Sequence, residues 1–163
     1  TNWRMIEMQA VIGRIQLQRM AEWTAARTAN ATSICSALAP FAGENGPLRV
    51  PELSNTQAAT GSRHAFYKFY AYVRPGNLAE GWSRDRVIEE IMARGVPCYQ
   101  GSCSEVYLEK AFDGTNWRPA ERLRIARELG ETSIMFLVHP TLAANEIATM
   151  KHAVAEVASS ASR

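Results

Sequence analysis

The sequence predicts an α/β domain in which helices pack against a small, mainly antiparallel sheet of three to four strands. Two segments, residues 64–73 and 134–138, have the composition of strands and lie far apart in the chain. A long helical pattern comes first, and shorter helical patterns lie between and after these strand segments. A chain of 163 residues fits one domain and can bury a core of its own.

The first helix is predicted over residues 2–30 and carries two apolar stripes. At about 100° per residue, Ile12 and Ile15 fall on one stripe, whereas Ile6 and Leu17 fall on another side of the helix. Either the helix runs through the centre of its own core, or the second stripe contacts a body that this chain does not contain. The sequence opens directly at the start of this helix, which favours a piece of a longer protein.

The strands are predicted from their apolar patterns. Residues 64–73 (HAFYKFYAYV) have an apolar face at the odd-numbered positions and an amphipathic face at the even ones, so we expect a strand covered on both sides. Residues 134–138 (IMFLV) are continuously apolar, which is typical of a strand buried on both faces. Residues 48–53 are a weaker candidate, and Pro51 restricts that strand to a sheet edge.

The first helix pattern is followed by Ser33–Leu38, which either continues it or forms a short second helix. Farther along, Ser83 is expected to cap a helix that runs to Arg94 with Met92 on its inner face. Gly95 then stands where a left-handed C-terminal cap belongs.

Three further helical segments are predicted. The first is a short stretch over residues 105–112, and the second begins at Pro119 and is closed by Gly130. Thr141 is expected to cap the last helix, and residues 159–163 to form a frayed tail.

Composition excludes several classes of function. The chain is 47% hydrophobic and 21% charged, and its formal net charge is only +2 with the arginines scattered. Binding to nucleic acid or to a membrane surface is therefore not indicated. No apolar run approaches the roughly 20 residues that a membrane-spanning helix needs. The three cysteines form no disulfide pattern, which favours a reducing, cytoplasmic setting.

No complete active site can be assembled from the residues alone. Lys68 lies among aromatic residues and could form a Schiff base, but we favour a strand lysine with a solvated ammonium group. Cys98 and Cys103 lack the CxxC spacing of a zinc or redox site, so ordinary thiols are the better interpretation. His64 and His139 lie at strand ends, where α/β folds often place functional groups, but we favour a structural role for both.

Four segments of the chain resemble a known family. Residues 2–17 are similar to the segment N-[YFW]-R-M-x-E-x-Q-A-x-x-G-x-x-Q-L of the DegT/StrS family, which are pyridoxal-phosphate-dependent sugar aminotransferases. Three later stretches resemble the same family in the same order: His64-x-x-Tyr67-x-x-Tyr70, the helix over residues 84–95, and residues 130–141. Together these cover nearly the whole chain.

The resemblance implies that residues 1–163 are the C-terminal, small domain of an aspartate-aminotransferase-type fold. The large domain, with the lysine that binds pyridoxal 5'-phosphate, would precede Asn2 and is absent from this chain. The intact enzyme would take an amino group from an amino acid, usually glutamate, and deliver it to a keto group of a nucleotide-linked sugar. It would be a homodimer, and this chain alone would be inactive.

The resemblance also assigns site residues. Asn2 matches the asparagine that reaches the cofactor phosphate bound by the partner subunit, and Arg4 matches an arginine near the substrate. Trp3, His64 and Tyr99 would contact substrate, and no catalytic residue would lie in this chain.

One departure from the family leaves the substrate open. The loop over residues 96–107 lacks the histidine that many relatives carry after its tyrosine, and offers Gln100, Ser102 and Cys103 instead. Two alternatives to an aminotransferase remain open. Some members of the superfamily carry histidine in place of the catalytic lysine and dehydrate sugars, and the chain could also be a non-catalytic dimerisation or interaction module.

Overall fold

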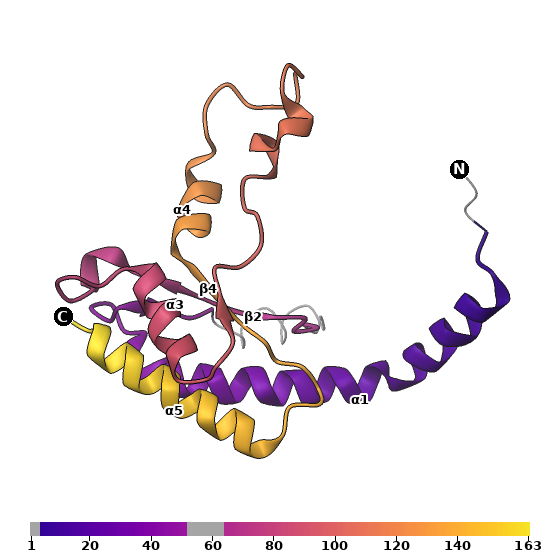
Figure 1. The fold of residues 1–163 in the computed structure, drawn as a ribbon, viewed down its shortest axis with the longest axis horizontal. Coiled ribbons are helices and arrows are strands. Elements are labelled where there is room, and N and C mark those ends of the chain that lie inside the picture. Colours follow the sequence, from indigo (N-terminus) through magenta and orange to yellow (C-terminus); the bar gives the residue numbers. More distant parts are fainter. Residues whose placement is uncertain (1–3, 52–63) are drawn as a thin grey trace.

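The computed structural model describes residues 4–51 and 64–163 and shows a four-stranded antiparallel sheet in the order β1-β2-β4-β3. Helices α1, α3 and α5 pack together on one face of this sheet, while α4 lies against the other face (Figure 1). The strands are β1 (Leu48–Arg49), β2 (Phe69–Val73), β3 (Cys98–Tyr99) and β4 (Ser133–Phe136). The helices are α1 (Glu7–Leu38), α3 (Arg84–Ala93), α4 (Arg124–Thr132) and α5 (Ala144–Ala161). The predicted fold class is confirmed.

The core lies between the sheet and the three helices. Phe69 of β2 and Cys98 of β3 both pair with Phe136 of β4, and all three side chains point to the helix side and are buried. Every residue of β4 is buried, as the apolar run predicted, but the strand ends at Phe136 and Leu137, within the predicted run, is 36% exposed. The short strand β3 lies where the sequence predicts a loop.

The strand predicted from His64 begins only at Phe69. Phe66 has a positive φ of 44°, and its N–H donates to Nδ1 of His64 at 3.0 Å. This turn reverses the expected alternation, so that Phe66 is buried whereas Tyr67 is 79% exposed. Left-handed backbone is unfavourable for a bulky residue, so burial of the Phe66 ring must offset that cost.

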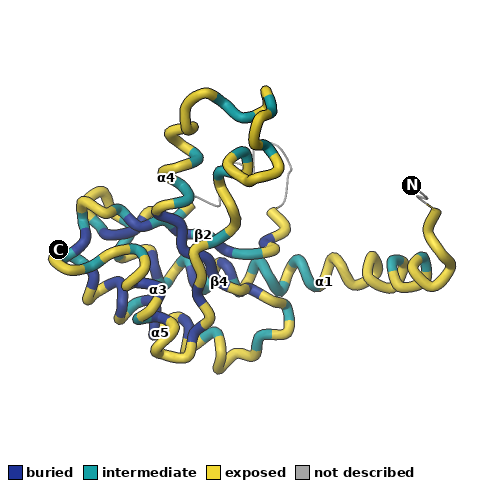
Figure 2. The backbone as a smooth tube through the Cα atoms, turned by 45° about the horizontal axis from the view of Figure 1, so that its top comes forward, coloured by how far each residue is buried: buried dark blue, intermediate teal, exposed yellow. Residues whose placement is uncertain are grey.

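Helix α1 is one continuous helix of 32 residues, so Ser33–Leu38 continues it. Its second half is buried through Ala31, Ile34 and Leu38, mainly against α5. Its first half projects beyond the sheet and is exposed on all sides (Figures 1 and 2). Both apolar stripes are therefore open to solvent in this half, and a helix running through the centre of its own core is excluded.

Helix α3 forms largely as predicted. The Ser83 hydroxyl accepts a hydrogen bond from the N–H of Arg86 at 3.1 Å, and Gly95 has a φ of 78° at the C-terminal end. Met92, expected on the inner face, is instead 48% exposed. The apolar stripe of α3 is thus narrower than the sequence indicated.

Helix α4 begins at Arg124 rather than at Pro119. Residues 102–123, here called the arm, project from the sheet and contain only two short 3-10 turns where residues 105–112 were predicted to be helical (Figure 1). Gly130 lies within α4 instead of ending it. A Cβ at this position would meet the hydroxyl of Ser104 and lie 3.3 Å from its Cβ, so the arm approaches α4 closely here.

The last helix also differs in its ends. Thr141 does not cap it; α5 begins at Ala144, and the Glu146 carboxylate accepts a hydrogen bond from the N–H of Ala143 at 2.7 Å. The predicted tail at residues 159–163 is wrong, because Ala161 is buried and Ser162 forms a β-bridge with Leu78. In the described part of the chain, no helix is both long enough and apolar enough to cross a bilayer.

We predict that the isolated chain self-associates through the projecting half of α1. Apolar patches beyond a few hundred Å² are rare on monomers, and Ile6, Leu17 and Met20 are all more than half exposed there. Sedimentation over a concentration series should show weak association, and Leu17→Glu should reduce it without altering thermal unfolding. A chain that stays monomeric at high concentration would contradict this prediction.

Leu38→Ala on the same helix is the matched control, since that side chain is 1% exposed. This substitution should lower the free energy of unfolding by about 2–5 kcal/mol. If Leu17→Glu lowers the free energy of unfolding as much as Leu38→Ala does, the first half of α1 contributes to the core, and this prediction is contradicted.

Candidate functional site

The face of the sheet opposite the three core helices carries polar and aromatic side chains. Tyr70 of β2 and Tyr99 of β3 both pair with Met135 of β4, which places them in one row across the sheet. Tyr72 lies in the next row, paired with Ser133 of β4 on one side. This open face, together with the base of the arm, is the candidate site.

The chain leaves the sheet at a tightly packed position next to Tyr99. Gly101 has a φ of 97°, and a Cβ there would lie 2.8 Å from Cε1 of Tyr70. The Tyr70 hydroxyl is 3.0 Å from the hydroxyl of Ser102, so the first residues of the arm are held over the tyrosine ring. Tyr99 itself is 45% exposed on an edge strand, where its side chain is accessible.

A polar network fixes the base of the arm. Arg84 is largely buried and donates from Nη1 to the backbone oxygens of Gly130 at 3.1 Å and Ser133 at 3.2 Å. Its Nε lies 2.6 Å from Oδ1 of Asp85, and the same oxygen accepts from Nε2 of Gln100 at 3.1 Å. Gln100, one of the three residues offered in place of the family's histidine, is therefore engaged within the domain.

The arm is held together by arginines and not by an apolar core. Arg118 donates from Nε to the backbone oxygen of Tyr107 at 2.9 Å, and Arg122 forms an ion pair with Glu105. The Tyr107 hydroxyl donates to Oε1 of Glu105 at 2.6 Å and accepts from the N–H of Leu123 at 2.9 Å. The Arg122 and Tyr107 hydrogen bonds lower the pKa of Glu105 to about 2.

We call the contacts of Glu105 with Arg122 and Tyr107 the clasp. No sequence pattern indicates it, because Glu105 and Arg122 are far apart in a segment without periodicity.

A polar cavity of about 500 Å³ lies between the arm and α4. It is lined by Gln100–Glu105 and Leu108–Lys110 on the arm side and by residues of α4 such as Arg127 and Glu131. On the outer side of the arm, Trp117 is 73% exposed.

The structure does not bring the predicted site residues together. Arg4 lies three residues before α1, whose first half projects beyond the sheet (Figure 1). His64 accepts the N–H of Phe66, and the two rings are 4.2 Å apart, which supports a structural role. Asn2 and Trp3 lie outside the described residues.

The remaining candidate groups also have structural explanations. Lys68 lies just before β2 and not within a strand, is half-buried, and has its Nζ 5.7 Å from the ring centroid of Tyr67. Nδ1 of His139 is 2.7 Å from the Thr141 hydroxyl, and its backbone oxygen accepts from Asn30 of α1. Burial raises the pKa of the Cys98 thiol to about 12, which makes it a poor nucleophile.

The described residues do not form a complete site for a metal or for pyridoxal phosphate. Within residues 4–51 and 64–163, no three His, Cys, Asp or Glu side chains are grouped as metal ligands. The chain has three lysines, and none of them is buried in a cavity where a Schiff base would be shielded from water. Tyr99 and the arm can form one wall of a site, but no catalytic step can be assigned to these residues.

The sequence profile of the DegT/DnrJ/EryC1/StrS aminotransferase family matches residues 1–155. The chain belongs to this family. The resemblance seen in residues 2–17 and in the three later segments is therefore confirmed. No protein with a curated description matches the sequence.

Solved structures of two aminotransferases and a dehydratase share this fold. The aminotransferase from Psychrobacter cryohalolentis is 57% identical and superposes with a TM-score of 0.90 over 96% of this chain. DesV from S. venezuelae, in complex with a ketimine intermediate, has 23% identity and a TM-score of 0.73 over 97%. The E. coli GDP-4-keto-6-deoxy-D-mannose-3-dehydratase with bound hydrated PLP has 17% identity and a TM-score of 0.70 over 96% of this chain. The chain spans only 40%, 38% and 36% of these three proteins.

We predict that the contacts of Glu105 with Arg122 and Tyr107, which hold the arm of this DegT-family chain, persist well below neutral pH. The pKa of Glu105 is lowered to about 2, so its ion pair is fully present above the unfolded-state pKa of about 4.3 and is lost as the pH falls through 2. The indole NMR signal of Trp117 should stay constant from neutral pH down to about 4 and change below it. Glu105→Gln should abolish that pH response, and a midpoint above about 4.3 would contradict the clasp.

Proposed function

We propose that this chain is the C-terminal domain of a pyridoxal-phosphate-dependent aminotransferase that transfers an amino group from an amino acid, such as glutamate, to a keto group of a nucleotide-linked sugar. The observation that carries this proposal is the family match over residues 1–155, together with 57% identity to an aminotransferase of which this chain spans 40%. The larger remaining part would supply the cofactor lysine. This domain would supply one wall of the site and part of a homodimer interface.

The geometry of α1 supports a role at a site built on another body. From Glu7 to Ala31, the first buried residue of the helix, α1 extends about 36 Å at roughly 1.5 Å per residue. Arg4 therefore lies too far from the core of this domain to act at its sheet. A residue carried on such a projection can reach a large domain or a partner subunit, as the family pattern implies for Asn2 and Arg4.

The exposed surfaces support the same proposal. The projecting half of α1 exposes apolar side chains on all sides, and the arm exposes Trp117 and Val106. Such surfaces are usual at interfaces and unusual on free monomers. A non-catalytic interaction module would share these surfaces, so the upstream sequence decides between the two: a preceding large domain with the cofactor lysine favours the enzyme.

A sugar dehydratase of the same superfamily is the second candidate. The fold of the E. coli dehydratase matches this chain with a TM-score of 0.70, which supports the fold alone. The residue at the Schiff-base position separates the two enzymes, since lysine favours the aminotransferase and histidine the dehydratase.

We predict that the 163-residue chain forms no covalent adduct with pyridoxal phosphate. Lys110 and Lys151 are exposed, and Lys68 is only partly covered, so none has the shielded position that favours a stable Schiff base. Mass spectrometry after borohydride reduction should find the unmodified chain. Stoichiometric labelling of Lys68 alone would overturn this prediction and the structural interpretation of that residue.

In the intact enzyme, we predict that Asn2→Ala weakens cofactor retention. One hydrogen bond from an amide to a phosphate contributes about 1.5–3 kcal/mol, so the dissociation constant should rise at least about tenfold. Equilibrium dialysis against pyridoxal phosphate measures this change. Asn77→Ala is a matched control, because Asn77 binds the backbone oxygens of Glu44 and Gly46 within the domain. Equal retention in wild type and Asn2→Ala would remove Asn2 from the site.

A further inference from the structure

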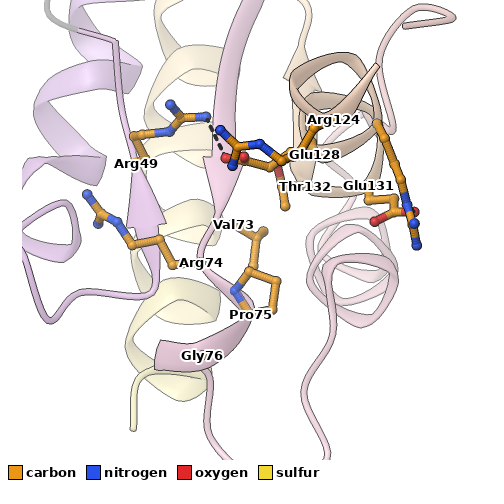
Figure 3. Close-up of a pocket in the computed structure, with 10 residues that line it drawn as sticks. Arg49, Val73, Arg74, Pro75, Gly76, Arg124, Glu128, Glu131 and Thr132 are labelled. Atoms are coloured by element: carbon orange, nitrogen blue, oxygen red, sulfur yellow. Dashed lines mark hydrogen bonds and ion pairs between the residues drawn. The ribbon is translucent and has the colours of Figure 1, made fainter. Parts of the chain in front are cut away.

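A second cavity, of about 620 Å³, lies between α4 and the ends of β1 and β2 (Figure 3). Four arginines line it together with two glutamates, which gives the lining a formal charge of +2. The arginines are Arg49, Arg74, Arg124 and Arg127, and the glutamates are Glu128 and Glu131. None of these residues stands out in the sequence, because they come from three separate segments.

Two of the four arginines have evident structural roles. Nη1 of Arg74 donates to backbone oxygens of the loop before β1, including that of Gly43 at 2.9 Å, and so fixes this loop. Arg127 pairs through Nε with Glu131, one turn farther along α4, at 2.7 Å. These contacts give each of the two guanidinium groups a partner within the domain.

The other two arginines, Arg49 and Arg124, have no close hydrogen bond or ion pair of this kind among the described residues. The guanidinium of Arg49 stacks on the ring of Tyr72 at 4.7 Å and reaches Glu128 only at 4.0 Å. Arg124 forms no hydrogen bond or ion pair with the described residues. Figure 3 shows Arg49 and Arg124 reaching into the same space from facing elements, with Glu128 between them.

The position of Arg124 in α4 makes its charge more conspicuous. It is the first residue of the helix, whose first turn contains no acidic residue. A cation at this end adds to the positive end of the helix dipole instead of compensating it, and Glu128, one turn farther along, is shared with Arg49. The stability of α4 therefore does not explain the presence of this arginine.

We infer that this pocket binds a ligand bearing phosphoryl groups, through Arg49 and Arg124. Guanidinium groups present planar pairs of N–H donors that match phosphate oxygens, and Tyr72 holds one of them in place. The cavity volume is in the range of small-ligand pockets and accommodates a diphosphate. Glu128 would compete with the anion for both arginines. This inference does not depend on the proposed aminotransferase function.

The test is calorimetric titration of the 163-residue chain at low ionic strength with inorganic pyrophosphate and, separately, with uridine diphosphate. We expect saturable one-site binding that weakens with added salt. Arg124→Gln and Arg49→Gln should each raise the dissociation constant about tenfold, because each removes charge-assisted hydrogen bonds. Glu128→Gln should lower it, because the competing carboxylate is gone. Thermal unfolding of each variant shows that the fold is retained.

Arg14→Gln is the matched control, since Arg14 is an exposed arginine on the projecting half of α1. Binding that is equally strong for both ligands assigns recognition to the phosphoryl groups alone, and tighter binding of uridine diphosphate adds a contact to the nucleoside; both support the site. The inference is overturned if neither ligand saturates, if Arg14→Gln weakens binding as much as Arg124→Gln, or if Arg124→Gln and Glu128→Gln leave binding unchanged.

Discussion

The pairing of β2 with β4 is the constraint on which the rest of the domain depends. These two strands share four residue pairs, whereas β1 and β3 each contribute only two residues to the edges of the sheet. On the helix side, the pair Phe69 and Phe136 provides the broad apolar floor onto which α1, α3 and α5 pack. An edge strand of two residues has little stability of its own, so both edges and all three helices rely on this central pair.

The opposite face is organised by polar contacts instead. Arg84 joins α3 to the end of α4 and the start of β4, and Gly101 lets the chain turn away directly over Tyr70. Beyond that turn, the clasp of Glu105 with Arg122 and Tyr107 holds the arm without a hydrophobic core. Polar networks of this kind fix geometry when every member is satisfied, and within the described residues no buried side-chain nitrogen or oxygen lacks a partner. Polar contacts therefore position the open face and the arm, with little help from apolar burial.

Local patterns predicted the elements that are buried in a regular way, and failed where long-range contacts decide. The apolar run of β4 and the caps of α3 were readable because burial and capping act over a few residues. At Phe66 a single left-handed residue reversed the alternation, and at α4 the arm displaced the helix start from Pro119 to Arg124. Of the predicted site residues, Tyr99 lies on the open face, whereas His64 is bound within its own loop. The polar clasp and the arginine pocket could not be predicted, since their members come together only through the fold.

The distribution of surfaces explains how a domain can matter to chemistry that it does not contain. Its one closed core needs only the second half of α1, so the first half of the helix contributes nothing to that core and exposes apolar side chains. Exposed apolar surface of this kind is a cost in solubility, which a protein does not keep without a contact that uses it. The same half of the helix carries one of the four segments that resemble the family. The packing of Ala31, Ile34 and Leu38 fixes one end of α1, and the start of the helix at Glu7 lies about 36 Å along the helix from Ala31, at about 1.5 Å per residue. The buried end of α1 thus acts as the anchor, and the exposed end as the part that reaches another body.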